Sequence, residues 1–241
     1  MAEWMYYVLS VLFVPLFVLT IIAQIKVSVT YNKYKNVKSN FGISAADCAR
    51  KMLDAKGLTS TRVLQTKGGS MSDYFDPRNN TVNLSNEGYN STSIASIAVA
   101  AHEVGHAYQH ADESYAPMRI RSKLVPIVNI GSHMVLPLFI IGVLVLVFNQ
   151  YSMVGTVMLW LAVCFYFLST LFYLVTLPIE INASKRALAT ISANGYLDQS
   201  EMPAAKELLT AAAWTYVAGL LTSIYYFLNF LLRVIMITRR D

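Results

Sequence analysis

Two histidines four residues apart form the first group in this sequence that can do chemistry. Residues 101–106 have the sequence AHEVGH, with Glu103 directly after His102. On an α-helix, residues i and i+4 share one face, so His102 and His106 can both offer an imidazole nitrogen to one cation. Zinc accepts imidazole readily, and in catalytic sites it keeps one position open for water. Glu103 can reach such a water as a general base, so the motif predicts metal-assisted hydrolysis.

A motif this short also occurs by chance, on surface helices that carry two unrelated histidines. Three features favour the metal interpretation. The chain has four histidines, and two of them fall in the motif. Gly105 lies inside the motif although glycine costs a helix about 1 kcal/mol relative to alanine, which close packing beside a metal would explain. An alanine-rich apolar stretch also precedes the motif, as expected for a buried helix.

A catalytic zinc site needs a third protein ligand, and three residues are candidates. His110 lies one turn beyond His106, about 6 Å along the axis, so a straight helix cannot bring both to one ion. Asp112 takes the last position of the longer pattern HExxHxxGxxH, but Gln109 replaces the glycine of that pattern, which weakens the case for Asp112. Glu180 directly follows a long apolar run. It is the better candidate, with an ordinary charge at a helix end as the alternative interpretation.

Four long apolar runs indicate the elements that must position these residues. The chain is 55% hydrophobic and 14% charged, whereas soluble domains carry about 25% charged residues. A helix needs about 20 apolar residues to cross a bilayer core. The runs cover residues 5–23, 130–148, 153–177 and 211–237. We expect about four transmembrane helices, the first being longer than the apolar core of a cleaved signal peptide.

The predicted fold is an α-helical multi-pass membrane protein with a small α+β aqueous domain of the zincin type. Its expected segments are a first transmembrane helix (1–25), an aqueous domain with the HExxH helix (26–123), a hairpin of two transmembrane helices (124–177), an aqueous segment with the third-ligand helix (178–210), and a fourth transmembrane or half-inserted helix (211–241). Because the hairpin returns the chain to the side it left, both aqueous segments are expected on one side of the membrane.

Local patterns in the larger aqueous segment predict the order helix, strand, strand, helix. Ser44 precedes a helical pattern of apolar residues, and Gly57 is expected just past the end of that helix. Strands are expected at residues 62–65 and 81–84, with turn residues between them. The serines and threonine at 91–93 can cap the helix that leads to the histidines. Residues 82–85 are also expected to bind substrate backbone by adding it to a strand edge.

The charge distribution bears on location and partners. Thirteen of the 19 lysines and arginines lie between Lys26 and Lys123, which favours the cytoplasmic face for this segment. These charges flank the apolar runs, so they indicate contact with the lipid bilayer rather than with nucleic acid. Cys48 and Cys164 lie in a polar and an apolar segment respectively, and no disulfide is expected.

Beyond these patterns, the chain resembles the YugP-like neutral zinc metallopeptidases of bacterial membranes. The segments that carry the resemblance are YFDP at 74–77, VNLS at 82–85, AVAAHEVGHAYQ at 98–109, EINAS at 180–184 and AAAWTYVA at 211–218. The group is distantly similar to the HtpX and CAAX-prenyl-protease class of membrane gluzincins. In that class the glutamate of an E-x-x-A-D pattern is the third zinc ligand. Glu180 and Ala183 match this pattern, and Ser184 stands at the aspartate position.

Together, the motif and the resemblance predict a membrane-integrated zinc metalloendopeptidase that hydrolyses peptide bonds in a peptide or protein substrate. One zinc ion per chain would be held by His102, His106 and Glu180, with Glu103 as general base. Ser184 and Asn182 are candidates to hydrogen-bond the ligands, and Tyr216 is a candidate oxyanion stabiliser, with an interfacial tyrosine anchor as the alternative. Two other classes are a zinc-binding membrane pseudo-peptidase or scaffold without turnover, and a small transporter. The sequence carries no indication of the oligomeric state.

Overall fold

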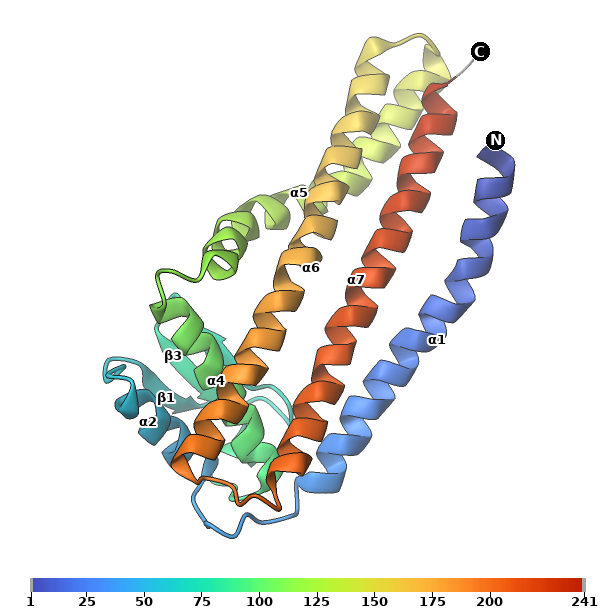
Figure 1. The fold of residues 1–241 in the computed structure, drawn as a ribbon. Helices are drawn as coiled ribbons and strands as arrows, with labels where there is room; N and C mark the ends of the chain where they lie inside the picture. The colour runs from blue at the N-terminus through green and yellow to red at the C-terminus, as the bar shows by residue number, and fades with distance from the viewer. Residues whose placement is uncertain (1, 240–241) are drawn as a thin grey trace. The chain divides into compact units, whose positions relative to one another are not determined.

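The computed structural model describes residues 2–239 of the chain (Figure 1). Side chains are described from Ser10 to Arg239. Its elements are α1 (Ala2–Tyr34), α2 (Ala45–Ala55), β1 (Arg62–Gln65), β2 (Tyr74–Asp76), β3 (Thr81–Leu84), α3 (Asn86–Tyr89), α4 (Ile94–Ala111), α5 (Ala116–Phe148), α6 (Met153–Asn194) and α7 (Met202–Thr238). They form two compact units. The helical unit contains the described residues 2–22, 119–177 and 216–239, and the α+β unit contains residues 23–118 and 178–215.

Among the described residues, four helices are long and apolar enough to cross a membrane. They are Ser10–Tyr34, Ala116–Phe148, Met153–Asn194 and Met202–Thr238, and each contains an 18-residue stretch with a mean hydropathy between 1.8 and 2.4. Large apolar side chains such as Val147 and Phe167 point outward along them, as lipid-facing residues do. The expected fold class is confirmed, because the chain combines these four helices with a small mixed sheet.

The sheet of the α+β unit has three strands in the order β1-β3-β2. β1 pairs with β3 in parallel, and β2 pairs with β3 antiparallel with Phe75 opposite Val82. The predicted strands at 62–65 and 81–84 are confirmed, whereas β2 was not predicted. The expectation that residues 82–85 offer a strand edge to substrate is wrong. β3 is the central strand, with β1 paired to one edge and β2 to the other, so neither edge is free. It is also buried along its whole length.

Helix ends in the α+β unit follow the capping residues of the sequence. The Ser44 side chain accepts a hydrogen bond from the Asp47 N–H at the start of α2. Gly57 lies just past the end of that helix with φ +72°, a conformation that favours glycine. Of the three candidate caps before α4, Ser93 is the one used, and it accepts from the Ser96 N–H.

The core of the α+β unit lies between α2, α4 and β3, where Met52, Leu53, Ile97 and Val82 are fully buried. The continuation of α6 into this unit adds a second buried stripe. Ile179, Ala183, Ala187 and Ile191, each four residues apart, are fully inaccessible to solvent. Four-residue spacing puts them on one helical face. Their burial fixes the rotation of α6 about its axis, and therefore the direction in which Glu180 points.

Candidate metal centre

The HExxH segment lies in the second half of α4 and is helical throughout, as its spacing requires. The His102 and His106 rings lie with their centroids 4.8 Å apart. Their side chains are 14% and 13% exposed, so solvent reaches both without surrounding them. The Nε2 atoms of both rings approach the same carboxylate oxygen, Oε2 of Glu180, at 3.3 Å and 3.4 Å.

Glu180 belongs to α6, which packs unusually close to α4 at this level. A Cβ atom on Gly105 would lie 2.6 Å from the carbonyl oxygen of Ala183, far inside van der Waals contact. Only a residue without a side chain lets the two backbones approach this closely. The glycine inside the motif therefore reflects packing against the helix that carries Glu180.

The three side chains meet in one cluster. One ligand atom from each of His102, His106 and Glu180 lies within 4.8 Å of the other two. Two imidazole nitrogens and one carboxylate oxygen are a donor set found in catalytic zinc sites. The outer ring nitrogens have partners of their own, Ser184 Oγ at 3.1 Å from His102 Nδ1 and Gln109 Oε1 at 3.0 Å from His106 Nδ1. Both Nε2 atoms are thereby directed into the cluster, and the donor set fits a zinc ion.

Glu103 is a buried carboxylate beside this cluster, with 8% of its surface exposed. Its Oε2 accepts a hydrogen bond of 2.9 Å from the backbone N–H of Phe75 in β2. Burial raises the pKa of the Glu103 carboxyl; the two histidines oppose this shift and the Glu180 charge adds to it. For His106, burial would lower the pKa, but the hydrogen bond to Glu180 and the charge of Glu180 raise it overall.

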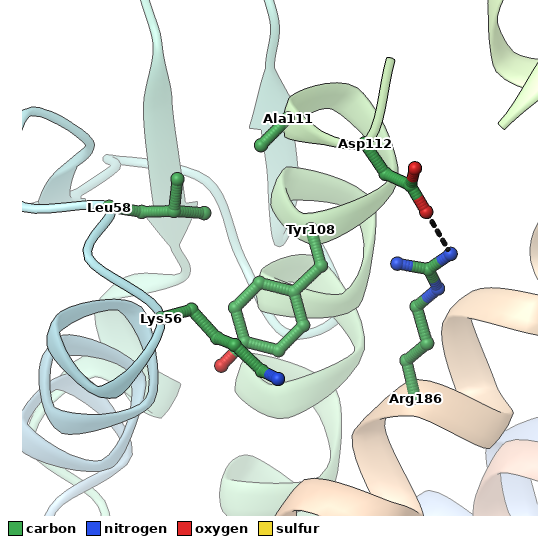
Figure 2. A pocket seen from close by; sticks show the side chains of 6 residues that line it. All are labelled: Lys56, Leu58, Tyr108, Ala111, Asp112 and Arg186. Carbon is green, nitrogen blue, oxygen red and sulfur yellow. Dashed lines mark hydrogen bonds and ion pairs between the residues drawn. The ribbon is translucent and has the colours of Figure 1, made fainter. Parts of the chain in front are cut away.

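Asp112, the alternative third ligand, is engaged elsewhere. Its Oδ2 accepts a hydrogen bond from Arg186 Nη2 at 2.8 Å (Figure 2), and its Oδ1 accepts from Ser114. The hydrogen bond from Arg186 lowers the pKa of this carboxyl. The pair lines a pocket of about 260 Å³ together with Lys56, Leu58, Tyr108 and Ala111. Among the described residues, Asp112 does not belong to the cluster of His102, His106 and Glu180.

The remaining predicted residues divide into three cases. Asn182 does not touch a histidine; its Oδ1 accepts from Gln109 Nε2 at 3.0 Å. Tyr216 belongs to α7 and to the helical unit, so its suggested role stays a prediction. His110 is exposed and packs its ring against Phe75 at 5.6 Å between centroids.

Sequence reasoning missed two groups at this site. One is the backbone N–H of Phe75, which no side-chain pattern can indicate. The other is Gln109, which the sequence analysis treated only as a replaced glycine. Its position three residues after His106 puts it on the same helical face. A polar residue on the buried face of an apolar helix was the available signal, since buried polar groups are nearly always hydrogen-bonded.

Comparison with known proteins agrees with this geometry. The model of a family described as "Putative neutral zinc metallopeptidase" matches residues 9–237. The chain is 37% identical over 219 residues to "Putative membrane protease YugP" of Bacillus subtilis (strain 168), and the match covers 91% of this chain and 92% of that protein. No solved structure matches the chain. Since both similarities cover nearly its whole length, the chain belongs to the family described as "Putative neutral zinc metallopeptidase".

Proposed function

We propose that this protein is a membrane-integrated zinc metalloendopeptidase of the gluzincin type. His102, His106 and Glu180 would hold one zinc ion, and Glu103 would act as general base. The observation that carries the proposal is the meeting of both Nε2 atoms with Glu180 Oε2, from helices far apart in the sequence. Zinc bound there would polarise the peptide carbonyl and make a water molecule more acidic.

Glu103 is suited to move a proton. The Phe75 N–H holds one of its carboxylate oxygens, Oε2, and this leaves Oε1 to accept a proton from water. A base that later passes its proton to the leaving amine works best with a pKa near the working pH, and burial shifts the pKa of Glu103 in that direction. The backbone contact also fixes the side chain against rotation, because the carboxylate is buried beside the strand.

An extended peptide is the proposed substrate. Among the described strands, β2 lies at the edge of the sheet, and Tyr74 in this strand is 49% exposed. Strand edges bind extended peptides through main-chain hydrogen bonds, which depend little on the side chains of the substrate. Since the Phe75 N–H is held by Glu103, a peptide paired with β2 would use the other main-chain groups of the strand and would run close to the proposed base. This assignment moves the substrate strand from residues 82–85 to residues 74–76.

We place the site on the cytoplasmic side of the bilayer. Thirteen of the 19 lysines and arginines of the chain fall within residues 23–118 and 178–215, the α+β unit. Lysines and arginines near the ends of transmembrane helices favour retention of a segment on the cytoplasmic side. Substrates would then be cytoplasmic or membrane-associated peptides and proteins.

The alternative of a zinc-binding scaffold without turnover finds less support. A scaffold would need the three ligands alone, whereas here a buried carboxylate lies beside them with its own backbone anchor. Burying a carboxylate costs free energy that a single backbone hydrogen bond offsets only in part, and a role in catalysis explains why the residue is there. The presence of Glu103 next to the cluster therefore favours an enzyme.

The test is zinc content and hydrolysis in the detergent-solubilised full-length chain. Wild-type protein should bind about one zinc ion per chain, because three ligands form one catalytic zinc site. His106→Ala should lose most of it. His110→Ala is the matched control, one turn further along α4 and outside the cluster, and it should retain zinc. Equal zinc content in the two variants would contradict the site.

Glu103→Gln separates an enzyme from a scaffold. The amide keeps the size of the side chain but cannot accept a proton, so zinc should be retained while cleavage of an unfolded protein substrate falls roughly 100-fold or more. Wild-type protein that holds zinc but cleaves no faster than Glu103→Gln would favour the scaffold.

A further inference from the structure

Gln109 joins the two helices that carry the proposed zinc ligands. It is 1% exposed, and its side chain makes three polar contacts. Oε1 lies 3.0 Å from Nδ1 of His106 on its own helix. Nε2 donates to the backbone carbonyl of Ile179 at 2.7 Å and to Oδ1 of Asn182 at 3.0 Å, both on α6.

These contacts determine which way the amide points. A backbone carbonyl can only accept a hydrogen bond, so the Gln109 atom that faces Ile179 must be the nitrogen. The amide oxygen then faces His106, and an amide oxygen can only accept. His106 must therefore carry its proton on Nδ1. In the neutral imidazole that binds a metal, the other nitrogen, Nε2, then carries the free lone pair on the side of the ring that faces Glu180.

Asn182, which lies on α6, supports the same orientation of the Gln109 amide. Its Oδ1 also accepts a hydrogen bond of 2.8 Å from Nε of Arg186. A guanidinium group is always a donor, so the oxygen of Asn182 cannot exchange places with its nitrogen. Arg186 is held in turn by Asp112 beside the pocket in Figure 2. Every donor and acceptor from Asp112 to His106 thus has a determined direction.

We propose that Gln109 is a positioning residue that sets the tautomer of His106 and ties it to α6, so that Nε2 is presented to zinc. The proposal rests on the proposed zinc site and adds a residue that neither the motif nor the resemblance assigns. Groups that orient a metal-bound histidine are usually carboxylates, backbone carbonyls or water. Here a neutral side chain fills that role and uses its second end to hold the neighbouring helix.

Zinc affinity, measured by chelator competition on the full-length protein, tests the proposal. Gln109→Met keeps the length of the side chain but removes all three polar contacts. Its zinc dissociation constant should rise by roughly 10- to 100-fold, the usual effect of losing a partner of a metal-bound histidine. Tyr108→Phe is the control. Tyr108 is the adjacent residue, and its hydroxyl donates to the backbone carbonyl of Met52 at 2.6 Å, away from the cluster. This variant should lose thermal stability and keep wild-type zinc affinity.

Variants at Asn182 give a second test that does not depend on Gln109→Met folding. Both contacts of Asn182 use its oxygen, so Asn182→Asp can accept the same two hydrogen bonds, whereas Asn182→Leu cannot. The aspartate variant should bind zinc like wild type, and the leucine variant several-fold more weakly. This rescue by a conservative change is not expected from a residue that only fills space.

The outcomes also separate this proposal from the proposed function. Loss of zinc in His106→Ala combined with wild-type affinity in Gln109→Met would keep the zinc site and overturn the role of Gln109. Equal affinities in Asn182→Asp and Asn182→Leu would overturn the role of Asn182. Failure of the wild-type chain to bind zinc would remove the proposed function itself.

Discussion

At the residue scale, the Nδ1 atoms of the two histidines in the cluster have neutral hydrogen-bond partners. Ser184 Oγ contacts His102 and Gln109 Oε1 contacts His106. The site already contains two buried carboxylates, Glu103 and Glu180. A third carboxylate behind a histidine would add to the cost of burying like charges close together. Neutral partners still orient the two imidazole rings. The negative charge of the site then stays on Glu180, the proposed ligand, and Glu103, the proposed base.

Ser184 stands where the E-x-x-A-D pattern has aspartate, and its replacement tests whether Nδ1 of His102 needs a partner. Ser184→Ala removes the hydroxyl that contacts His102 Nδ1 and should weaken zinc binding by roughly tenfold. Ser184→Asp restores an acceptor and should bind zinc more tightly than Ser184→Ala. Chelator competition measures both variants. Indistinguishable affinities in the two variants would show that Nδ1 of His102 needs no partner.

The residues of the site were predictable to different degrees. His102, Glu103 and His106 follow from helical spacing alone, because the period of a helix decides which side chains share a face. Glu180 lies 78 residues from His102, and it became a candidate through the return of the chain after a hairpin and through the resemblance to the E-x-x-A-D pattern. The partners of Gln109 could not be predicted, since they depend on which atoms of α6 face α4 after packing.

At the element scale, the close packing of α4 and α6 brings the ligands together. The contact between Gly105 and Ala183 lies one turn or less from His102, His106 and Glu180 along the two helices. Glycine in a helix interior costs about 1 kcal/mol relative to alanine, so its use here opposes the local preference of the helix. At Gly105, tertiary packing therefore outweighs helix propensity, and Gly105 lies at the proposed site.

Gly105→Ala should therefore damage the site although alanine favours a helix. The new Cβ would meet the Ala183 carbonyl, a backbone atom that cannot rotate away, so one helix must move. A displacement of about 1 Å can cost roughly 100-fold in rate, and we expect hydrolysis to fall by that order and zinc to bind more weakly.

Gly219→Ala is the matched control for this change. It is also a glycine inside a helix, but its nearest neighbour is the Tyr173 side chain at 3.4 Å, an ordinary contact. This variant should keep wild-type zinc affinity and activity. If Gly105→Ala behaved in the same way, the close approach of the two helices would be irrelevant to the site.

The elements themselves were largely predictable because their signals are local. The cap at Ser44, the glycine at position 57 and the strands at 62–65 and 81–84 were all confirmed. β2 was missed because it has three residues and lies among turn residues, too short for an alternating pattern. The role of residues 82–85 was wrong for a related reason. Which strand lies at the centre depends on pairing between distant segments, which strand patterns do not contain.

At the scale of the whole molecule, two separate stretches of chain build the α+β unit. Residues 23–118 and 178–215 form one compact unit, so both stretches must lie on the same side of the bilayer. Its basic residues favour the cytoplasm, although the positive-inside rule weakens for segments longer than about 60 residues. The side on which the proposed site lies therefore needs a direct measurement.

Labelling with a membrane-impermeant thiol reagent provides that measurement. Cys48 and Cys164 are both free and would first be replaced by alanine. Single cysteines would then be introduced at Lys67 and Lys185, exposed positions in the two stretches of the α+β unit, and at Tyr151, which is 85% exposed between α5 and α6.

The two lysine positions should react only when the reagent can reach the cytoplasmic face, as in inverted membrane vesicles. Tyr151→Cys should show the opposite pattern in intact cells, because the tip of a hairpin that crosses the bilayer emerges on the far side. Labelling of both lysine positions from outside would place the site on the external face and direct the search for substrates there. Labelling of Lys67→Cys and Lys185→Cys from different faces would contradict a single α+β unit, and with it Glu180 as a zinc ligand.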